Sequence, residues 1–144
     1  MIRFEPTPFQ RIVLTLSAAI AVWIGVKGMT EPQQFLAAME IEVGTPGARN
    51  EIRGQYGGYF IALGLLWLAG AAGLIRTSTA LVSLLVLYGG VLSGRAASLA
   101  IDGAEAFAAY PGILQRAHAL DAVGFLLTSA ALAAADRQQS RSPG

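Results

Sequence analysis

Seven side chains in this sequence have the chemistry of a binding site, and they occur in three short stretches. The first stretch supplies a carboxylate, a guanidinium and a phenol, the second a guanidinium and a carboxylate, and the third an imidazole and a carboxylate. In chain order these residues are Glu51, Arg53, Tyr56, Arg95, Asp102, His118 and Asp121. Guanidinium groups bind anions or hydrogen-bond to carbonyl oxygens, while carboxylates and an imidazole set local charge and supply protons. The set therefore predicts a polar ligand site.

The composition argues against several other kinds of site. The chain has no cysteine and a single histidine, which excludes thiolate chemistry and disfavours a metal centre. The glycine-rich Gly54-Gln55-Tyr56-Gly57-Gly58 lacks the Gly-Lys-Ser/Thr of a phosphate loop, and no nucleophile elbow or zincin motif occurs. A net charge of +1 without a Lys/Arg run gives no basis for nucleic-acid binding. We predict no catalytic residue and no metal, can name no cofactor, and favour a non-enzymatic role.

These side chains belong to a chain with the composition of a membrane protein. Of its 144 residues, 54% are hydrophobic and 13% are charged. A soluble domain is usually about a quarter charged. Apolar runs over about residues 9–27, 53–75, 80–101 and 113–135 are each long enough to cross a bilayer. The predicted fold is therefore all-α, a four-transmembrane-helix antiparallel bundle forming a single integral membrane domain over residues 1–144.

Two sequence signals predict where helices begin. Thr7-Pro8-Phe9-Gln10 places Thr at the N-cap, Pro at the first helical position and Gln three residues after the cap. Thr30-Glu31-Pro32-Gln33 repeats the pattern before a shorter segment of about residues 31–43, whose apolar residues recur at helical spacing. That segment is too short and too acidic to span. We predict a short amphipathic helix between spans one and two, on the membrane surface or over the bundle mouth, with a partly ordered loop as the alternative.

Four spans place both chain termini on one side of the membrane. The tails and turn on that side hold the larger share of arginine, namely Arg3, Arg11, Arg76, Arg137 and Arg141. The positive-inside rule therefore predicts cytoplasmic termini in the cell inner (plasma) membrane. With this topology the three ionisable stretches meet at the outer ends of the second, third and fourth spans. We predict an outward-facing polar pocket there.

Arg95 and Asp121 are the most informative of the seven residues, because both lie inside predicted spans. Charges inside a bilayer are costly, so they turn inward and pair. We expect Arg95 to pair with Asp121 or Glu51, either as a structural ion pair or as part of a ligand site. Headgroup anchoring is the alternative role for Glu51 and Arg53. Two small-residue stripes, Gly54-x-x-x-Gly58 and Gly90-x-x-x-Gly94, predict close approach of the second and third spans.

These motifs together resemble an uncharacterised bacterial family of four-helix integral membrane proteins, classed as a domain of unknown function. The resemblance covers nearly the whole chain and implies a four-helix membrane fold, but it implies no activity. It rests on the signature positions Asn50, Glu51, Arg53, Tyr56, Gly57, Gly58, Arg95, Asp102 and Gly103, with Asp121 matched to an acid of the last span. More distantly the chain is similar to DoxX-type four-helix membrane proteins, some of which are linked to quinone-coupled redox chemistry.

Three functional hypotheses follow. In the leading one, a multi-pass membrane protein binds a small molecule, a quinone-like compound or a lipid headgroup in the outward-facing pocket. In the second, the chain is a non-catalytic accessory or assembly subunit of a larger membrane complex. The third is an enzyme or transporter, although the sequence shows no inverted repeat or broken half-helix. The expected partners are the lipid bilayer, such a ligand, and a membrane protein partner or a second copy of the chain.

Overall fold

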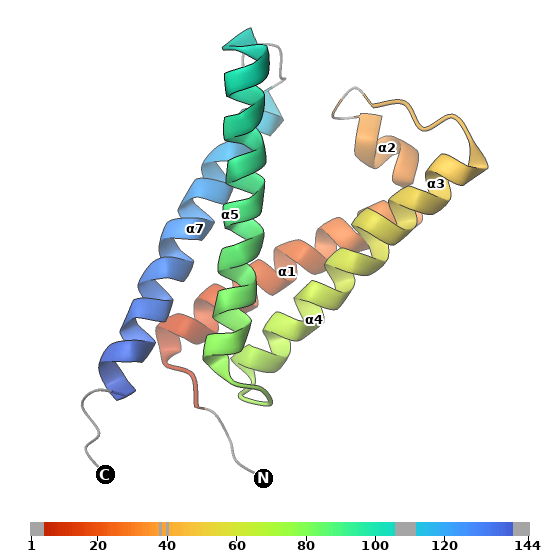
Figure 1. Ribbon diagram of the computed structural model, residues 1–144. Helices are drawn as coiled ribbons and strands as arrows, with labels where there is room; N and C mark the ends of the chain where they lie inside the picture. The colour runs from red at the N-terminus through yellow and green to blue at the C-terminus, as the bar shows by residue number, and fades with distance from the viewer. Residues whose placement is uncertain (1–4, 38, 40, 106–111, 140–144) are drawn as a thin grey trace.

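The structure, a computed structural model, describes residues 5–37, 39, 41–105 and 112–139. Every regular element in these ranges is helical, which confirms the all-α prediction for the described part of the chain. The elements are shown in Figure 1. They are α1 Pro8–Thr30, α2 Pro32–Ala37, α3 Pro46–Ile52, the π-helix η1 Arg53–Gly58, α4 Tyr59–Ala71, α5 Thr77–Asp102 and α7 Gly112–Gln139.

Within the described residues, three helices are long and apolar enough to cross a membrane, which indicates a membrane protein. They are Pro8–Thr30, Thr77–Asp102 and the Arg116–Ala134 part of α7. The predicted second span is divided into three elements, since α3, η1 and α4 follow one another directly from residue 46 to residue 71. Figure 1 shows them as one continuous ribbon that lies beside α1.

The start of α1 is held by the predicted capping arrangement. The backbone N–H of Gln10 donates to Thr7 Oγ1 at 3.2 Å, and the backbone N–H of Thr7 donates to Gln10 Oε1 at 2.9 Å. Two N–H groups that the first helical turn leaves without partners are thereby satisfied. The buried Gln10 side chain also donates from Nε2 to the Ala131 carbonyl oxygen of α7 at 3.1 Å. The cap thus joins the first and last long helices.

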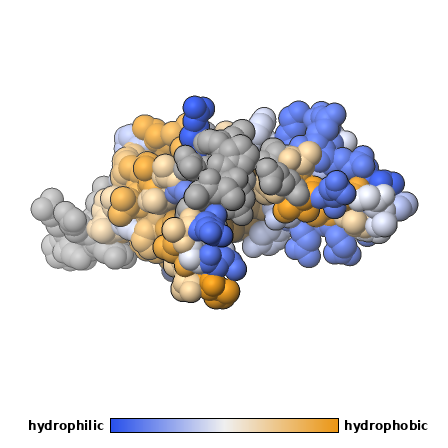
Figure 2. All heavy atoms as spheres, turned by 90° about the horizontal axis from the view of Figure 1, so that it is seen from above, coloured by the Kyte–Doolittle hydropathy of each residue, from blue (hydrophilic) through white to orange (hydrophobic). Residues whose placement is uncertain are grey.

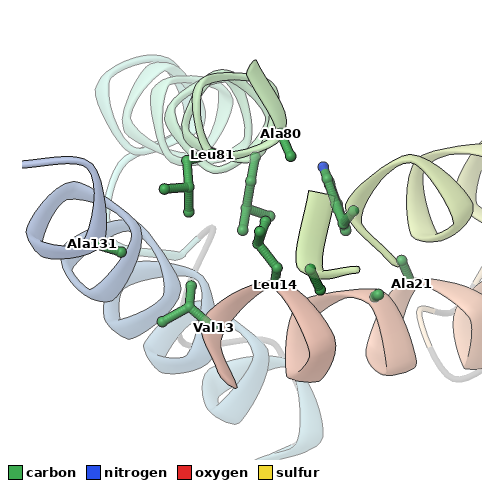
Figure 3. Close-up of a cluster of buried hydrophobic side chains, with 10 residues drawn as sticks. Val13, Leu14, Ala21, Ala80, Leu81 and Ala131 are labelled. Carbon is green, nitrogen blue, oxygen red and sulfur yellow. The ribbon is translucent and has the colours of Figure 1, made fainter. Parts of the chain in front are cut away.

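The helices form two pairs that meet at one end and diverge toward the other. In Figure 1, α1 lies beside η1 and α4, and α5 lies beside α7. The pairs meet around a core of buried side chains from all four long helical stretches, part of which Figure 3 shows. The core consists of Val13, Leu14, Ala18, Ala21, Trp67, Ala71, Ala80, Leu81, Leu84 and Ala131. Trp67 Nε1 donates to Ser83 Oγ at 3.0 Å, so the core's largest side chain keeps its polar atom satisfied.

Close approach within the first pair depends on glycines outside the two predicted stripes. A Cβ on Gly25 of α1 would lie 2.8 Å from the Gly57 carbonyl oxygen, and one on Gly64 would lie 2.6 Å from Val22. By contrast, a Cβ on Gly54, Gly90 or Gly94 would meet nothing within 4 Å. The predicted stripes at Gly54-x-x-x-Gly58 and Gly90-x-x-x-Gly94 were therefore wrong. Spacing alone does not show which side of a helix faces a neighbour.

The amphipathic helix predicted over residues 31–43 is much shorter than expected. α2 ends at Ala37 because the Leu36 carbonyl oxygen accepts from the N–H groups of Met39 and Ile41, at 2.8 and 3.1 Å. These bonds close a turn instead of continuing the helix. Beyond the turn, Gln33 Nε2 donates to the Val43 carbonyl oxygen at 3.2 Å. Of the predicted helix, only the six residues of α2 are described as helical.

Candidate functional site

Arg95 of α5 and Asp121 of α7 form an ion pair across the second helix pair. Arg95 Nη2 donates to Asp121 Oδ2 at 2.6 Å, and Nε donates to the same oxygen at 3.1 Å. The two side chains are 27% and 21% exposed. Asp121 is one of the two partners predicted for Arg95, and Glu51 is not its partner. Because the charges lie within helices that can span a membrane, pairing lowers the cost of holding each of them there.

Helix packing one to two turns away from the ion pair sets the distance between Arg95 and Asp121. A Cβ added to Gly124 of α7 would fall within 2.8 Å of ring atoms of Tyr88, so the phenol ring of α5 lies directly against the α7 backbone. Arg95 lies two helical turns beyond Tyr88, and Asp121 lies one turn before Gly124 on its own helix. Residues separated by whole turns lie on one face of a helix. The faces of α5 and α7 that bring Tyr88 against Gly124 therefore also bring Arg95 close to Asp121. Tyr88 and Gly124 are positioning residues that sequence reasoning missed.

The ion pair does not use all of its hydrogen-bonding capacity. Both bonds end on Oδ2, and within the described residues neither Asp121 Oδ1 nor Arg95 Nη1 has a hydrogen bond. A bidentate pair would have used two carboxylate oxygens. Arg95 Nη1 and Asp121 Oδ1 thus remain able to bind other groups, on side chains that are partly exposed. His118 lies three residues before Asp121 and interacts electrostatically with both members of the pair.

Arg53 has a different partner from the one that a shared pocket would require. Its Nε donates to the Met29 carbonyl oxygen at 3.1 Å. Met29 belongs to the last turn of α1, where carbonyl groups lack partners within the helix and carry partial negative charge. Arg53 therefore caps α1 from the neighbouring helix.

Tyr56 belongs to an aromatic cluster that connects α2 to the first pair. Its ring centroid lies 5.5 Å from that of Phe35 and 6.1 Å from that of Phe60, the latter in a stacked arrangement. These separations are typical of favourable aromatic contacts. The cluster places α2 over η1 and fixes the start of the loop that follows it.

The other two predicted site residues lie apart from the ion pair. Glu51 is exposed on α3, and Asp102 is exposed at the end of α5, where its Oδ2 accepts from Ser98 Oγ at 2.9 Å on the same helix. In Figure 1 the α3 end of the first pair diverges from the upper end of α5. The structure thus brings together Arg95, His118 and Asp121, and it leaves Glu51, Arg53 and Tyr56 on the other pair.

The signature segment itself has an unusual backbone. Residues Arg53–Gly58 form a π-helix, in which the N–H of Tyr59 donates to the Gly54 carbonyl oxygen five residues earlier. π-helical turns are rare and occur frequently at functional positions. Here the wide turn lies against the last part of α1, since a Cβ added to Gly57 would lie within 3.3 Å of the Met29 backbone. Periodicity analysis could not detect it, because it assumes an α-helical repeat.

The hydropathy of the surface differs between the two helix pairs. Seen from above in Figure 2, hydrophilic residues cover the end that carries α2 and α3, while hydrophobic residues cover much of the α5 and α7 side. An open hollow of about 490 Å³ lies within the α2 return loop, away from the ion pair. It is lined by Gln33, Ala37, Ile41, Glu42, Val43 and Gly44.

Comparison with known proteins places most of the chain in one family. The family model described as "Domain of unknown function (DUF4345)" matches residues 9–114. The match includes Arg95 and residues 50–58 and ends before Asp121. No curated protein and no solved structure matches the chain.

Proposed function

The chain belongs to the DUF4345 family, a domain of unknown function, and we propose that it is a four-span membrane protein that binds a small polar ligand at Arg95 and Asp121. The ligand is a small molecule, a quinone-like compound or a lipid headgroup. This proposal places the site between α5 and α7, with His118 beside it. It does not require Glu51, Arg53, Tyr56 or Asp102 to contact the ligand.

In addition to the three long apolar helices, the continuous helical stretch from residue 46 to residue 71 would cross the membrane. It would be the second span in chain order. It contains no charged side chain after Arg53, and the chain remains uncharged as far as Arg76. Figure 1 shows α1 beginning and α7 ending at the same end of the molecule, as an even number of passes requires. The arginine-rich tails and turn at that end support cytoplasmic termini in an inner membrane.

The observation that carries the ligand proposal is the incompletely used ion pair. An ion pair that only holds two membrane helices together contributes most to stability when both carboxylate oxygens and both terminal guanidinium nitrogens are hydrogen-bonded and buried. Arg95 and Asp121 instead share one oxygen and remain partly exposed. A ligand that accepts from Nη1, donates to Oδ1, or does both would complete the arrangement.

Ligand-dependent thermal stability in mild detergent tests this proposal. Purified wild-type protein, Arg95→Gln and Arg53→Gln would each be measured with phospholipids, quinones and small anions. We expect at least one ligand class to stabilise the wild type and Arg53→Gln, but not Arg95→Gln. Arg53→Gln is the matched control because it removes an arginine already bound to a backbone carbonyl. Equal stabilisation of wild type and Arg95→Gln by every ligand would show that the pair is not a binding site.

A second candidate function is that of an accessory subunit. The observation in its favour is the open face of α5 at Gly90 and Gly94, where a Cβ would meet no atom within 4 Å. Small residues at such spacing let another membrane helix approach closely. Native mass spectrometry after gentle extraction would detect the partner or a second copy. A strictly monomeric protein whose Gly90→Leu variant behaves like wild type would count against this function.

A further inference from the structure

Charged residues at both ends of the apolar stretches suggest where the hydrocarbon boundary lies. On α5 no charged residue occurs between Arg76 and Arg95. At a rise of 1.5 Å per residue these two positions are about 28 Å apart, close to the hydrocarbon thickness of about 30 Å. On α1 the uncharged stretch between Arg11 and Lys27 covers about 24 Å by the same rule. Arg95 therefore lies near the outer headgroup boundary.

Exposed aromatic side chains mark a headgroup boundary on the first helix pair as well. Trp23 of α1 is 61% exposed and Tyr59 of α4 is 54% exposed. The two residues flank the close contact between Gly25 and the Gly57 carbonyl oxygen, so they lie at similar heights. Trp and Tyr are enriched where headgroups meet hydrocarbon. A molecule reaching Arg95 and Asp121 from the bilayer would thus present its headgroup to them.

The charges of the pair restrict the kind of headgroup. Arg95 and Asp121 together are neutral, so a lone anion that approaches Nη1 also approaches the Asp121 carboxylate, and a lone cation meets the guanidinium. A group with an anion and a hydrogen-bond-donating cation a few atoms apart would complement both. Phosphate accepts well from arginine, and a primary ammonium has three N–H donors for a carboxylate.

We propose that the Arg95–Asp121 pair binds an aminoethyl phosphate group, the headgroup of an aminophospholipid. The phosphate would accept from Arg95 Nη1, and the ammonium would donate to Asp121 Oδ1. This inference rests on the proposed function, because it names the ligand class of the same site. The headgroup would bind the donor and the acceptor that the described residues leave without hydrogen bonds.

A headgroup series on the wild-type protein gives the first test. Native mass spectrometry would measure binding of phosphatidylethanolamine, its N-methyl and N,N-dimethyl derivatives, phosphatidylcholine and phosphatidylglycerol, all with identical acyl chains. We expect affinity to fall as N–H donors are replaced by methyl groups. Phosphatidylcholine, which has none, should bind about tenfold more weakly than phosphatidylethanolamine, the effect of one charge-assisted hydrogen bond. Equal binding of the two lipids would overturn the inference without any need for a variant.

A variant arm assigns the preference to the carboxylate. Asp121→Asn keeps the shape but loses the charge, so we expect its preference for phosphatidylethanolamine over phosphatidylcholine to disappear. Glu51→Gln, which removes an exposed carboxylate on the other helix pair, should keep it. Soluble O-phosphoethanolamine separates the two possible sources of the group: competition at millimolar concentration would indicate a headgroup-sized free ligand, and no competition would indicate a membrane lipid. If Asp121→Asn kept the preference for phosphatidylethanolamine over phosphatidylcholine, the assignment of that preference to the Asp121 carboxylate would be wrong.

The outcomes also separate this inference from the proposed function. If phosphatidylglycerol, a quinone or inorganic phosphate binds in an Arg95-dependent way without any preference for primary amines, the site stands and its ligand class is different. If no ligand in the panel depends on Arg95, both the site and its assignment to aminophospholipids are wrong.

Discussion

The two helix pairs are held together by different kinds of contact. In the first pair, glycines bring the backbones of α1 and η1–α4 together, with Gly25 against the Gly57 carbonyl oxygen. In the second pair, α5 and α7 are held apart by side chains, with the Tyr88 ring on Gly124 and Arg95 on Asp121. Backbone-close packing leaves no space for a ligand between helices. Side-chain packing leaves room for groups whose polar atoms are only partly used.

Two arginines, one in each pair, show the consequence. Arg53 donates to a backbone carbonyl at the end of α1, an interaction that completes a helix terminus. Arg95 donates twice to one carboxylate oxygen, and its Nη1 has no hydrogen bond to the part of the chain that the structure describes. The same residue type therefore stabilises the fold in one pair and forms a candidate site in the other.

The largest effect is expected from substitution of the glycine contact in the first pair. In Gly25→Leu even the first side-chain atom would lie 2.6 Å from Ile61 Cγ1 and 2.9 Å from the Ile61 backbone nitrogen. Overpacking against a backbone that cannot move aside should cost roughly 3 kcal/mol. The midpoint of thermal unfolding in detergent would measure it. Gly90→Leu is the control on α5, and we expect a change within about 0.5 kcal/mol because the space there is open. Similar losses in both variants would contradict the distinction between the pairs.

The features that the sequence could predict are those set by local spacing or by the chemistry of a single pair. The capping box at Thr7 and the helical character of the apolar runs follow from local pattern, and both are confirmed. Arg95 and Asp121 could be matched because charges within apolar helices need partners of opposite sign. The sequence could not identify Met29 as the partner of Arg53, since every residue carries a backbone carbonyl and none is marked by its side chain.

The register of helix packing could not be predicted from the sequence either. Glycine spacing predicts that a helix has a small face, but not whether a neighbour covers it, so Gly90 and Gly94 were assigned the role that Gly25 has. The π-helix at Arg53–Gly58 changes the register of the residues that precede it. Glu51, which precedes the π-helix, is therefore offset from the position that a regular α-helix would give it.

An intermediate effect is expected from separation of the ion pair in the second helix pair. Arg95→Ala and Asp121→Ala should each destabilise the protein by about 1–3 kcal/mol, below the cost for a fully buried pair because both side chains are partly exposed. A double-mutant cycle should give a coupling energy of about 1–2 kcal/mol. Unfolding with a denaturing detergent, followed by tryptophan fluorescence, would measure it. A coupling near zero would show that the two residues are adjacent without interacting.

The smallest effect is expected from loss of the arginine that caps α1. Arg53→Met keeps the aliphatic stem but removes the donor and the charge, and at an exposed helix end this should cost about 0.5–1 kcal/mol. The change should be local: hydrogen exchange should accelerate in the last turn of α1, around Lys27 to Thr30, and not in α5 or α7. Glu51→Gln on the neighbouring α3 is the control, and we expect it to leave that exchange unchanged. If Arg53→Met were instead to abolish Arg95-dependent ligand binding, the two arginines would belong to one site and the two helix pairs would not be functionally distinct.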